Sequence, residues 1–104
     1  AGLTIDILVA RDVINDRKKI SKGTTLPLFI DITELLSIDA PARNYMANSE
    51  ACEFLSAGAI YTKNKLLAFI GQTFILLDRP PIPTKVFCDV EQAMKWLEPF
   101  KHHS

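Results

Sequence analysis

Hydrophobic and polar positions repeat with two periods along this chain, and the change of period divides it into helices and strands. Near the start, apolar residues recur at helical spacing, at Leu3, Ile7, Ala10 and Ile14. This spacing predicts an amphipathic helix over 4–20, with Thr4 at its N-cap and Gly23 just past its end. A basic cluster follows the stripe, formed by Arg17, Lys18, Lys19 and Lys22, and we interpret it as a solvated helix end.

Three short apolar runs predict strands at 26–32, 57–62 and 84–88. The first is almost continuously apolar, which is typical of a strand covered on both faces. A polar turn after Asp31 separates this strand from a helix that opens at Asp39, with Pro41 in its first turn. We expect that helix to run, or to break and resume, as far as Leu55.

Two more helices are predicted in the second half of the chain. A helix is predicted over 63–77, apolar on all sides from Leu66 onward. It ends at a loop over 78–83, because the three prolines of that loop exclude a helix. Asp89 and Gln92 have the spacing of a capping box, and the helix they begin should end at Pro99, near Phe100.

The predicted order is therefore α-β-α-β-α-β-α, which favours an α/β fold with a mainly parallel sheet and helices packed on it. We expect a single domain over residues 1–104. Because the pattern opens directly on a helix, we also expect an N-terminal strand or hairpin that is missing from this sequence or is supplied elsewhere, for instance by a partner subunit. The missing segment is the favoured alternative.

Charge and composition disfavour two classes of function, nucleic-acid binding and a membrane-spanning role. Lys and Arg total 12, as do Asp and Glu, so the net charge is zero and nucleic-acid binding is disfavoured. The twelve apolar residues 66–77 would span about 18 Å as a helix, too short for a bilayer core of about 30 Å. With no secretion signal visible, we expect a cytoplasmic protein without a membrane span.

The cysteines and histidines have no spacing that predicts a metal or nucleophile site. Cys52 and Cys88 lie among apolar neighbours, and we interpret both as buried free thiols in a reducing compartment. His102 and His103 are in the terminal tail, where they give no serine a positioned general base. We therefore predict no catalytic residue, metal or cofactor.

The best candidate site is the corner that follows the first predicted strand, where Asp31 lies at the strand end. Ligands of α/β proteins bind outside the carboxyl ends of parallel strands. Asp31 is interpreted first as a turn-forming carboxylate and second as a site residue, and phosphoaspartate chemistry is disfavoured. The predicted partner-binding surface comprises Asp31, Thr33, Ser37, Asp39 and Arg43. We expect Arg43 to pair with Asp39 four residues earlier.

The apolar helix is the second candidate. A helix that is apolar all round is either buried on all sides or packed against a second chain. A thin sheet cannot easily bury it, so either a dimer interface or an apolar ligand groove is expected. The residues proposed for this surface are Phe69, Ile70, Phe74 and Leu77, with Gly71 allowing close backbone approach.

Taken in series, these segments resemble the STAS/SpoIIAA-like superfamily, and within it small bacterial domains of uncharacterised function. The segments that carry the resemblance are Leu-Phe-Ile-Asp-Ile at 28–32, Ala-Arg-Asn-Tyr at 42–45, Ala-Gly-Ala-Ile-Tyr at 57–61, Pro-Pro-Ile-Pro-Thr-Lys-Val-Phe at 80–87 and Glu-Gln-Ala-Met-Lys-Trp-Leu at 91–97. The resemblance implies an α/β domain that works by protein–protein contact, or one that holds a lipid-like molecule.

One departure from the family pattern matters for function. STAS antagonists have a phosphorylatable serine at the helix start, where this sequence has Ala40 and Pro41. The leading hypothesis is therefore a non-enzymatic regulatory module that lacks the phosphoswitch and binds a protein partner, and we expect it to be a homodimer. The alternative hypothesis is binding or carriage of an apolar small molecule or lipid. A small enzyme using Asp31 or Asp39 is the least favoured.

Overall fold

The computed structural model describes residues 3–101, and His102 and His103 lie outside this range. Within it the order of elements is β1–α1–β2–β3–α2–β4–α3–β5–α4, followed by a 3-10 turn. The strands are β1 (Leu3–Ile5), β2 (Leu26–Asp31), β3 (Leu35–Ile38), β4 (Leu55–Tyr61) and β5 (Thr84–Phe87). The helices are α1 (Ile7–Ser21), α2 (Ala40–Met46), α3 (Lys65–Asp78), α4 (Val90–Leu97) and the 3-10 turn η1 (Glu98–Lys101).

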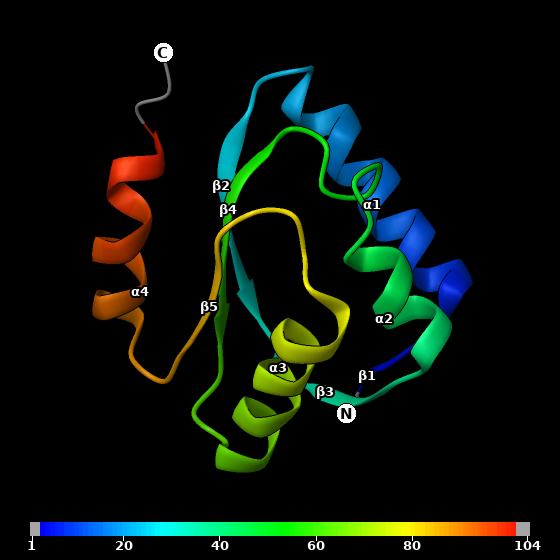
Figure 1. The fold of residues 1–104 in the computed structure, drawn as a ribbon, viewed down its shortest axis with the longest axis vertical. Coiled ribbons are helices and arrows are strands. Elements are labelled where there is room, and N and C mark those ends of the chain that lie inside the picture. The colour runs from blue at the N-terminus through cyan, green and yellow to red at the C-terminus, as the bar shows by residue number, and fades with distance from the viewer. Residues whose placement is uncertain (1–2, 102–104) are drawn as a thin grey trace.

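The fold has a parallel sheet at its centre, in the strand order β2-β4-β5. Helix α4 covers one face of this sheet, and α1, α2 and α3 lie on the other side (Figure 1). Strands β1 and β3 form a separate parallel pair. The predicted α/β class with parallel strands and packed helices is confirmed.

The face of the sheet toward α4 holds the tightly packed core. Its buried members are Ala57, Ala59, Phe87, Ala93 and Leu97. Aromatic rings close the edges of this core, with the Trp96 ring centroid 5.5 Å from that of Phe87 and 5.1 Å from that of Phe100. Small alanines on both β4 and α4 allow the helix to lie close to the sheet, where burial of apolar surface stabilises the fold.

Side chains alternate along β4, so its next residues face the other helices. Gly58 and Ile60 are on that face, opposite Ala57 and Ala59. Helix α3 comes closest to the sheet at Gly71, where an added Cβ would lie 3.0 Å from a methyl of Val86. The close approach expected at Gly71 therefore occurs against the protein's own strand β5.

The start of the chain differs from the prediction of a helix over 4–20 capped by Thr4. Residues 3–5 are a strand, because they pair with β3, and the helix begins at Ile7. Its N-cap is Asp6, whose side chain accepts a hydrogen bond from the Val9 N–H. The helix ends one residue later than predicted, at Ser21, and Lys22 adopts the left-handed C-cap conformation before Gly23.

The segment predicted as a polar turn after Asp31 also differs, since residues 35–38 form β3. Helix α2 then ends at Met46 rather than at Leu55, and turns fill the residues up to β4. The physical reason is pairing: β1 and β3 are each too short to be stable alone and are held by one another. The predicted order α-β-α-β-α-β-α was wrong at these two strands.

The caps predicted for the later helices are confirmed. Asp39 accepts a hydrogen bond from Ala42 N–H at 2.9 Å, and Asp89 accepts one from Gln92 N–H at 3.2 Å. Helix α3 begins after Asn64, whose side chain accepts from two backbone N–H groups. Pro99 lies in the 3-10 turn that ends the last helix.

Candidate functional site

A cavity of about 220 Å³ lies between the sheet and the three helices on its second face. Every layer around it contributes apolar side chains, among them Ile14, Leu28, Ile30, Met46, Ile60 and Phe74. The cavity follows from the helix placement: α4 packs directly on small alanines, whereas α1, α2 and α3 meet the sheet over long aliphatic residues. Interiors of proteins contain few voids larger than a water molecule, so a space of this size is a candidate binding site.

Two arginines contribute to the wall of this cavity, and the first is neutralised within the protein. Arg43 Nε lies 2.5 Å from Asp78 Oδ2, in an ion pair that lacks hydrogen-bond geometry. The Asp78 side chain is only 4% exposed. The expected pair of Arg43 with Asp39 was therefore wrong, because Asp39 is used as a helix cap and α3 brings Asp78 to Arg43 instead.

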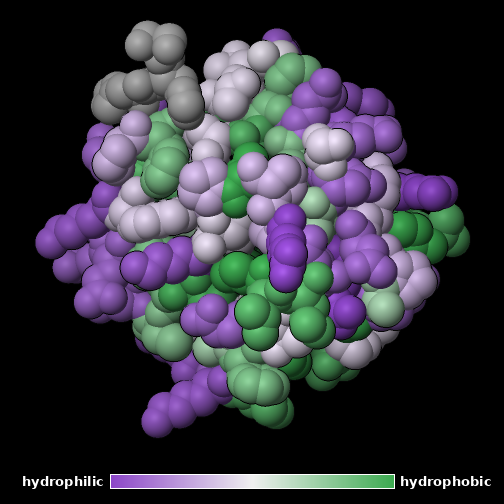
Figure 2. All heavy atoms as spheres, viewed as in Figure 1, coloured by the Kyte–Doolittle hydropathy of each residue, from purple (hydrophilic) through white to green (hydrophobic). Residues whose placement is uncertain are grey.

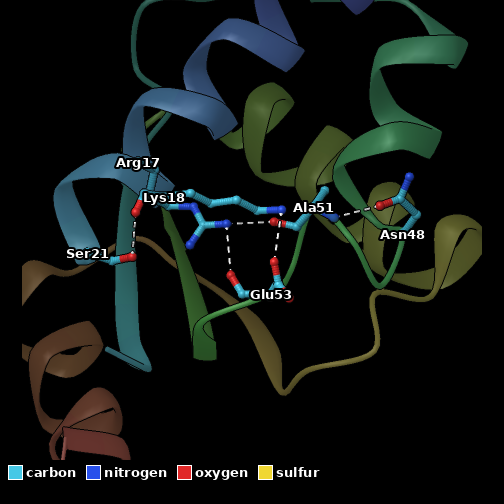
Figure 3. Close-up of polar contacts among 6 residues, drawn as sticks. All are labelled: Arg17, Lys18, Ser21, Asn48, Ala51 and Glu53. Carbon is cyan, nitrogen blue, oxygen red and sulfur yellow. Dashed lines mark hydrogen bonds and ion pairs between the residues drawn. The ribbon is translucent and has the colours of Figure 1, made fainter. Parts of the chain in front are cut away.

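The second arginine, Arg17, is half-buried rather than solvated, which corrects its interpretation as part of a solvated helix end. Its Nη2 donates to the backbone oxygens of Ala51 at 2.7 Å and Glu53 at 3.1 Å (Figure 3). Burial lowers the Arg17 pKa from its ordinary value, against an opposing attraction from Cys52 and Glu53. The neighbouring Lys18 pairs with the Glu53 carboxylate at 3.4 Å.

The sequence did contain a signal for Arg17. It lies three residues after Ile14 and seven after Ala10, and both of those side chains are buried. Residues at this spacing share one helix face, so Arg17 continues the inward stripe of α1. This inward position was missed because Arg17 was grouped with the neighbouring lysines as one solvated cluster.

The two cysteines have different environments. Cys52 is buried beside the cavity and its thiol donates to the Met46 backbone oxygen at 3.4 Å. Burial raises the Cys52 pKa, an effect reduced by the nearby Arg17 and Lys18. Cys88 is exposed, which corrects the expectation that both thiols are buried. It follows the end of β5, where the chain turns out of the sheet.

The corner predicted as a partner surface uses its polar groups locally. Asp31 accepts a hydrogen bond from the Thr33 N–H at 2.9 Å, and both residues are exposed. The Thr33 side chain and then its N–H lower the Asp31 pKa. Ser37 is exposed on β3, two residues before the Asp39 cap of α2. No group of three His, Cys, Asp or Glu within residues 3–101 is arranged to hold a metal ion.

The residues proposed on the apolar helix divide between two faces of α3. Ile70 and Phe74 line the cavity. Phe69 and Leu77 point away and are 68% and 63% exposed, together with Leu66 at 69%. Figure 2 shows apolar side chains gathered on the lower half of the viewed face, over α3. The helix is thus buried on one side only.

Comparison with known proteins identifies the family. Residues 1–101 match the family model DUF7793, a domain of unknown function. The chain belongs to this family. A search of curated proteins found no match.

A solved structure with the same architecture supports the fold. It is that of an uncharacterised protein of the DUF3478 family, with a SpoIIAA-like fold, from Shewanella loihica PV-4. The two chains are 19% identical and superpose with a TM-score of 0.64, over 90% of this chain and 77% of the other. The resemblance to the SpoIIAA-like fold is therefore confirmed. Among the helices of residues 3–101, none has the length and apolar character needed to cross a bilayer.

Proposed function

We propose that this protein binds an apolar small molecule in the cavity between its sheet and helices α1, α2 and α3. The observation that carries the proposal is an apolar space of about 220 Å³ in a chain of 104 residues. Leaving such a space empty forfeits packing contacts for the apolar side chains that line it. An occupant would recover them, as benzene does in engineered apolar cavities of about 150 Å³.

The proposed activity is binding or carriage rather than catalysis. The carboxylates of Asp31 and Asp39 each accept a hydrogen bond from a nearby backbone N–H, at 2.9 Å in both cases. Both groups thus serve the local backbone, which supports the non-enzymatic hypothesis. We also propose a reducing compartment, the cytoplasm, since Cys52 and Cys88 are free thiols.

The test uses the neutral fluorophore N-phenyl-1-naphthylamine and the two thiols. We expect saturable binding of one fluorophore per chain and slower alkylation of Cys52 when it is bound. Cys88, exposed and outside the cavity wall, is the internal control and should react at an unchanged rate. Absence of saturable binding, or equal protection of the two thiols, would contradict the proposal.

A second candidate function, protein contact through a homodimer, is favoured by the outer face of α3. Leu66, Phe69, Thr73 and Leu76 form an uncharged stripe at helical spacing. The Thr73 hydroxyl donates to the Phe69 backbone oxygen at 2.9 Å, so its polar group is already bonded within the helix. Across a two-fold axis, antiparallel copies of α3 would place Phe69 against Thr73 twice, which a self-complementary interface requires.

Two variants separate these candidates. Phe69→Lys places a charge on the exposed stripe and should convert a dimer to a monomer in analytical ultracentrifugation, with fluorophore binding retained. Gly58→Val extends a side chain from β4 into the cavity and should weaken fluorophore binding, with the oligomeric state retained. A wild-type protein that sediments as a monomer at high concentration would exclude the dimer.

The surface formed by Asp31, Thr33, Ser37 and Asp39 is our proposal for contact with a different protein partner. All four residues are exposed, and α2 begins with Ala40 and Pro41, which have no hydroxyl to phosphorylate. A contact there would be constitutive rather than phosphoswitched. Ser37→Arg should abolish binding of such a partner, whereas Phe69→Lys should not.

A further inference from the structure

The guanidinium of Arg17 is the only cation in the cavity wall, within residues 3–101, that no carboxylate pairs with directly. Of the two arginines there, Arg43 forms its ion pair with Asp78. Arg17 has backbone carbonyls as its partners, and the carboxylate of Glu53, which attracts Arg17, pairs with Lys18. The Glu53 side chain is 56% exposed, so solvent screens its attraction for Arg17.

One terminal nitrogen of Arg17 has no hydrogen-bond partner. Nη2 is used by the two carbonyls, whereas Nη1 is buried and unbonded. In Figure 3 the dashed lines from the guanidinium all leave from the same nitrogen. Buried donors in native proteins are nearly always satisfied by protein or by water, so this charged donor at the cavity wall is available to an acceptor that is not part of the chain, either a water or a ligand.

Arg17 also lies where two cavities meet. A second cavity, of about 250 Å³, lies between the end of α1 and the start of β2 and shares Arg17, Leu28 and Leu55 with the first. Two residues of its shorter wall carry hydroxyl groups, Ser21 and Thr24, whereas the larger wall of the first cavity has one, Thr84, whose hydroxyl donates to the Ile82 backbone oxygen. Arg17 therefore lies between the apolar first cavity and the more polar second cavity. This arrangement matches a molecule with an apolar body and an anionic end.

We propose that the ligand carries a carboxylate that accepts a hydrogen bond from Arg17 Nη1, with its apolar part in the 220 Å³ cavity. This inference rests on the proposed ligand-binding function and names the class of ligand: a short aliphatic or aromatic acid. Arginine suits this role because its planar donors match a carboxylate and it stays charged when half-buried.

The test compares octanoate with 1-octanol, which has the same carbon chain but no charge, by isothermal titration calorimetry at pH 7. We expect octanoate to bind at least tenfold more tightly to the wild-type protein, the scale of a hydrogen bond to a charged group. Arg17→Met keeps the length of the side chain and should abolish this preference. Lys18→Met removes the adjacent charge, which is not in the cavity wall, and should preserve it.

The outcomes separate this inference from the function on which it rests. Equal affinity for octanoate and octanol would overturn the anionic class while leaving the cavity as a binding site. A preference that survives in Arg17→Met would overturn the role of Arg17. Binding of neither compound would overturn the cavity as a ligand site. The wild-type comparison needs no variant, so it decides the anionic class even if Arg17→Met fails to fold.

Discussion

Gly58 offers a direct test of the cavity, because it lines this space from the middle of β4. Its backbone φ is not positive, and a Cβ added there would meet its nearest atoms, on Thr84 and Ile82, at 3.9–4.0 Å. These are ordinary van der Waals distances. Alanine therefore fits at this position without strain, and its methyl group would be buried.

The expected effect of Gly58→Ala has two parts. Removing a glycine from a compatible position restricts the unfolded chain and stabilises by about 0.4–1 kcal/mol. Burying one methyl group adds about 0.8 kcal/mol. Together they predict a gain of roughly 1–2 kcal/mol, which for a domain of this size raises Tm by about 5–15 °C.

Gly23→Ala is the matched control, since it makes the same chemical change at a site where the backbone conformation favours glycine. Gly23 has φ +82° and no atom within 4 Å of an added Cβ. Alanine there gains no contact and is strained by about 1 kcal/mol or more, so stability should fall. Urea unfolding with an unchanged m value measures both variants. A loss of stability in Gly58→Ala would refute the open space beside β4.

Three further predictions concern polar groups. Asp39→Ala should lower the free energy of unfolding in urea by about 1 kcal/mol, since it removes the α2 cap, whereas Asp39→Asn should preserve most of it. Thr33→Ala should raise the Asp31 pKa toward its ordinary value in an NMR titration. Because the pKa of Asp31 is lower in the folded protein than in the unfolded chain, the stability that Asp31 contributes is present above pH 3.8 and is lost as the pH falls. Asp78→Asn should cost about 2 kcal/mol in thermal unfolding by leaving Arg43 without its counter-charge, and adding Arg43→Met should recover part of that loss. The respective predictions would be contradicted by an unchanged free energy of unfolding in Asp39→Ala, by an unchanged Asp31 pKa in Thr33→Ala, or by additive effects in the Asp78→Asn, Arg43→Met double variant.

Local rules in the sequence determined most of the regular structure. Asp39 and Asp89 were recognised as helix caps because a carboxylate that accepts from an N–H three residues later needs no long-range contact. The strands at 26–31, 55–61 and 84–87 were recognised from short apolar runs within one or two residues of their ends. The proline-rich loop after α3 was equally local, since proline excludes a helix wherever it lies.

The candidate site depended on contacts between distant segments. Arg17 receives its two carbonyl partners from residues 34 and 36 positions away, so nothing in the run of cations around it could reveal them. The partner of Arg43 lies on α3 rather than on its own helix, because α2 and α3 pack side by side. When a charged side chain has both a local and a distant candidate partner, the packing of the helices decides which ion pair forms.

The sequence by itself determined that this chain folds as an α/β domain with parallel strands, because hydrophobic period and capping act over a few residues. The tertiary structure alone decided that β1 pairs with β3, that one face of the sheet is packed on alanines, and that the other face encloses a cavity with Arg17 in its wall. The reason is that a side chain's burial and charge environment depend on which segments meet, and that choice is made by the whole chain.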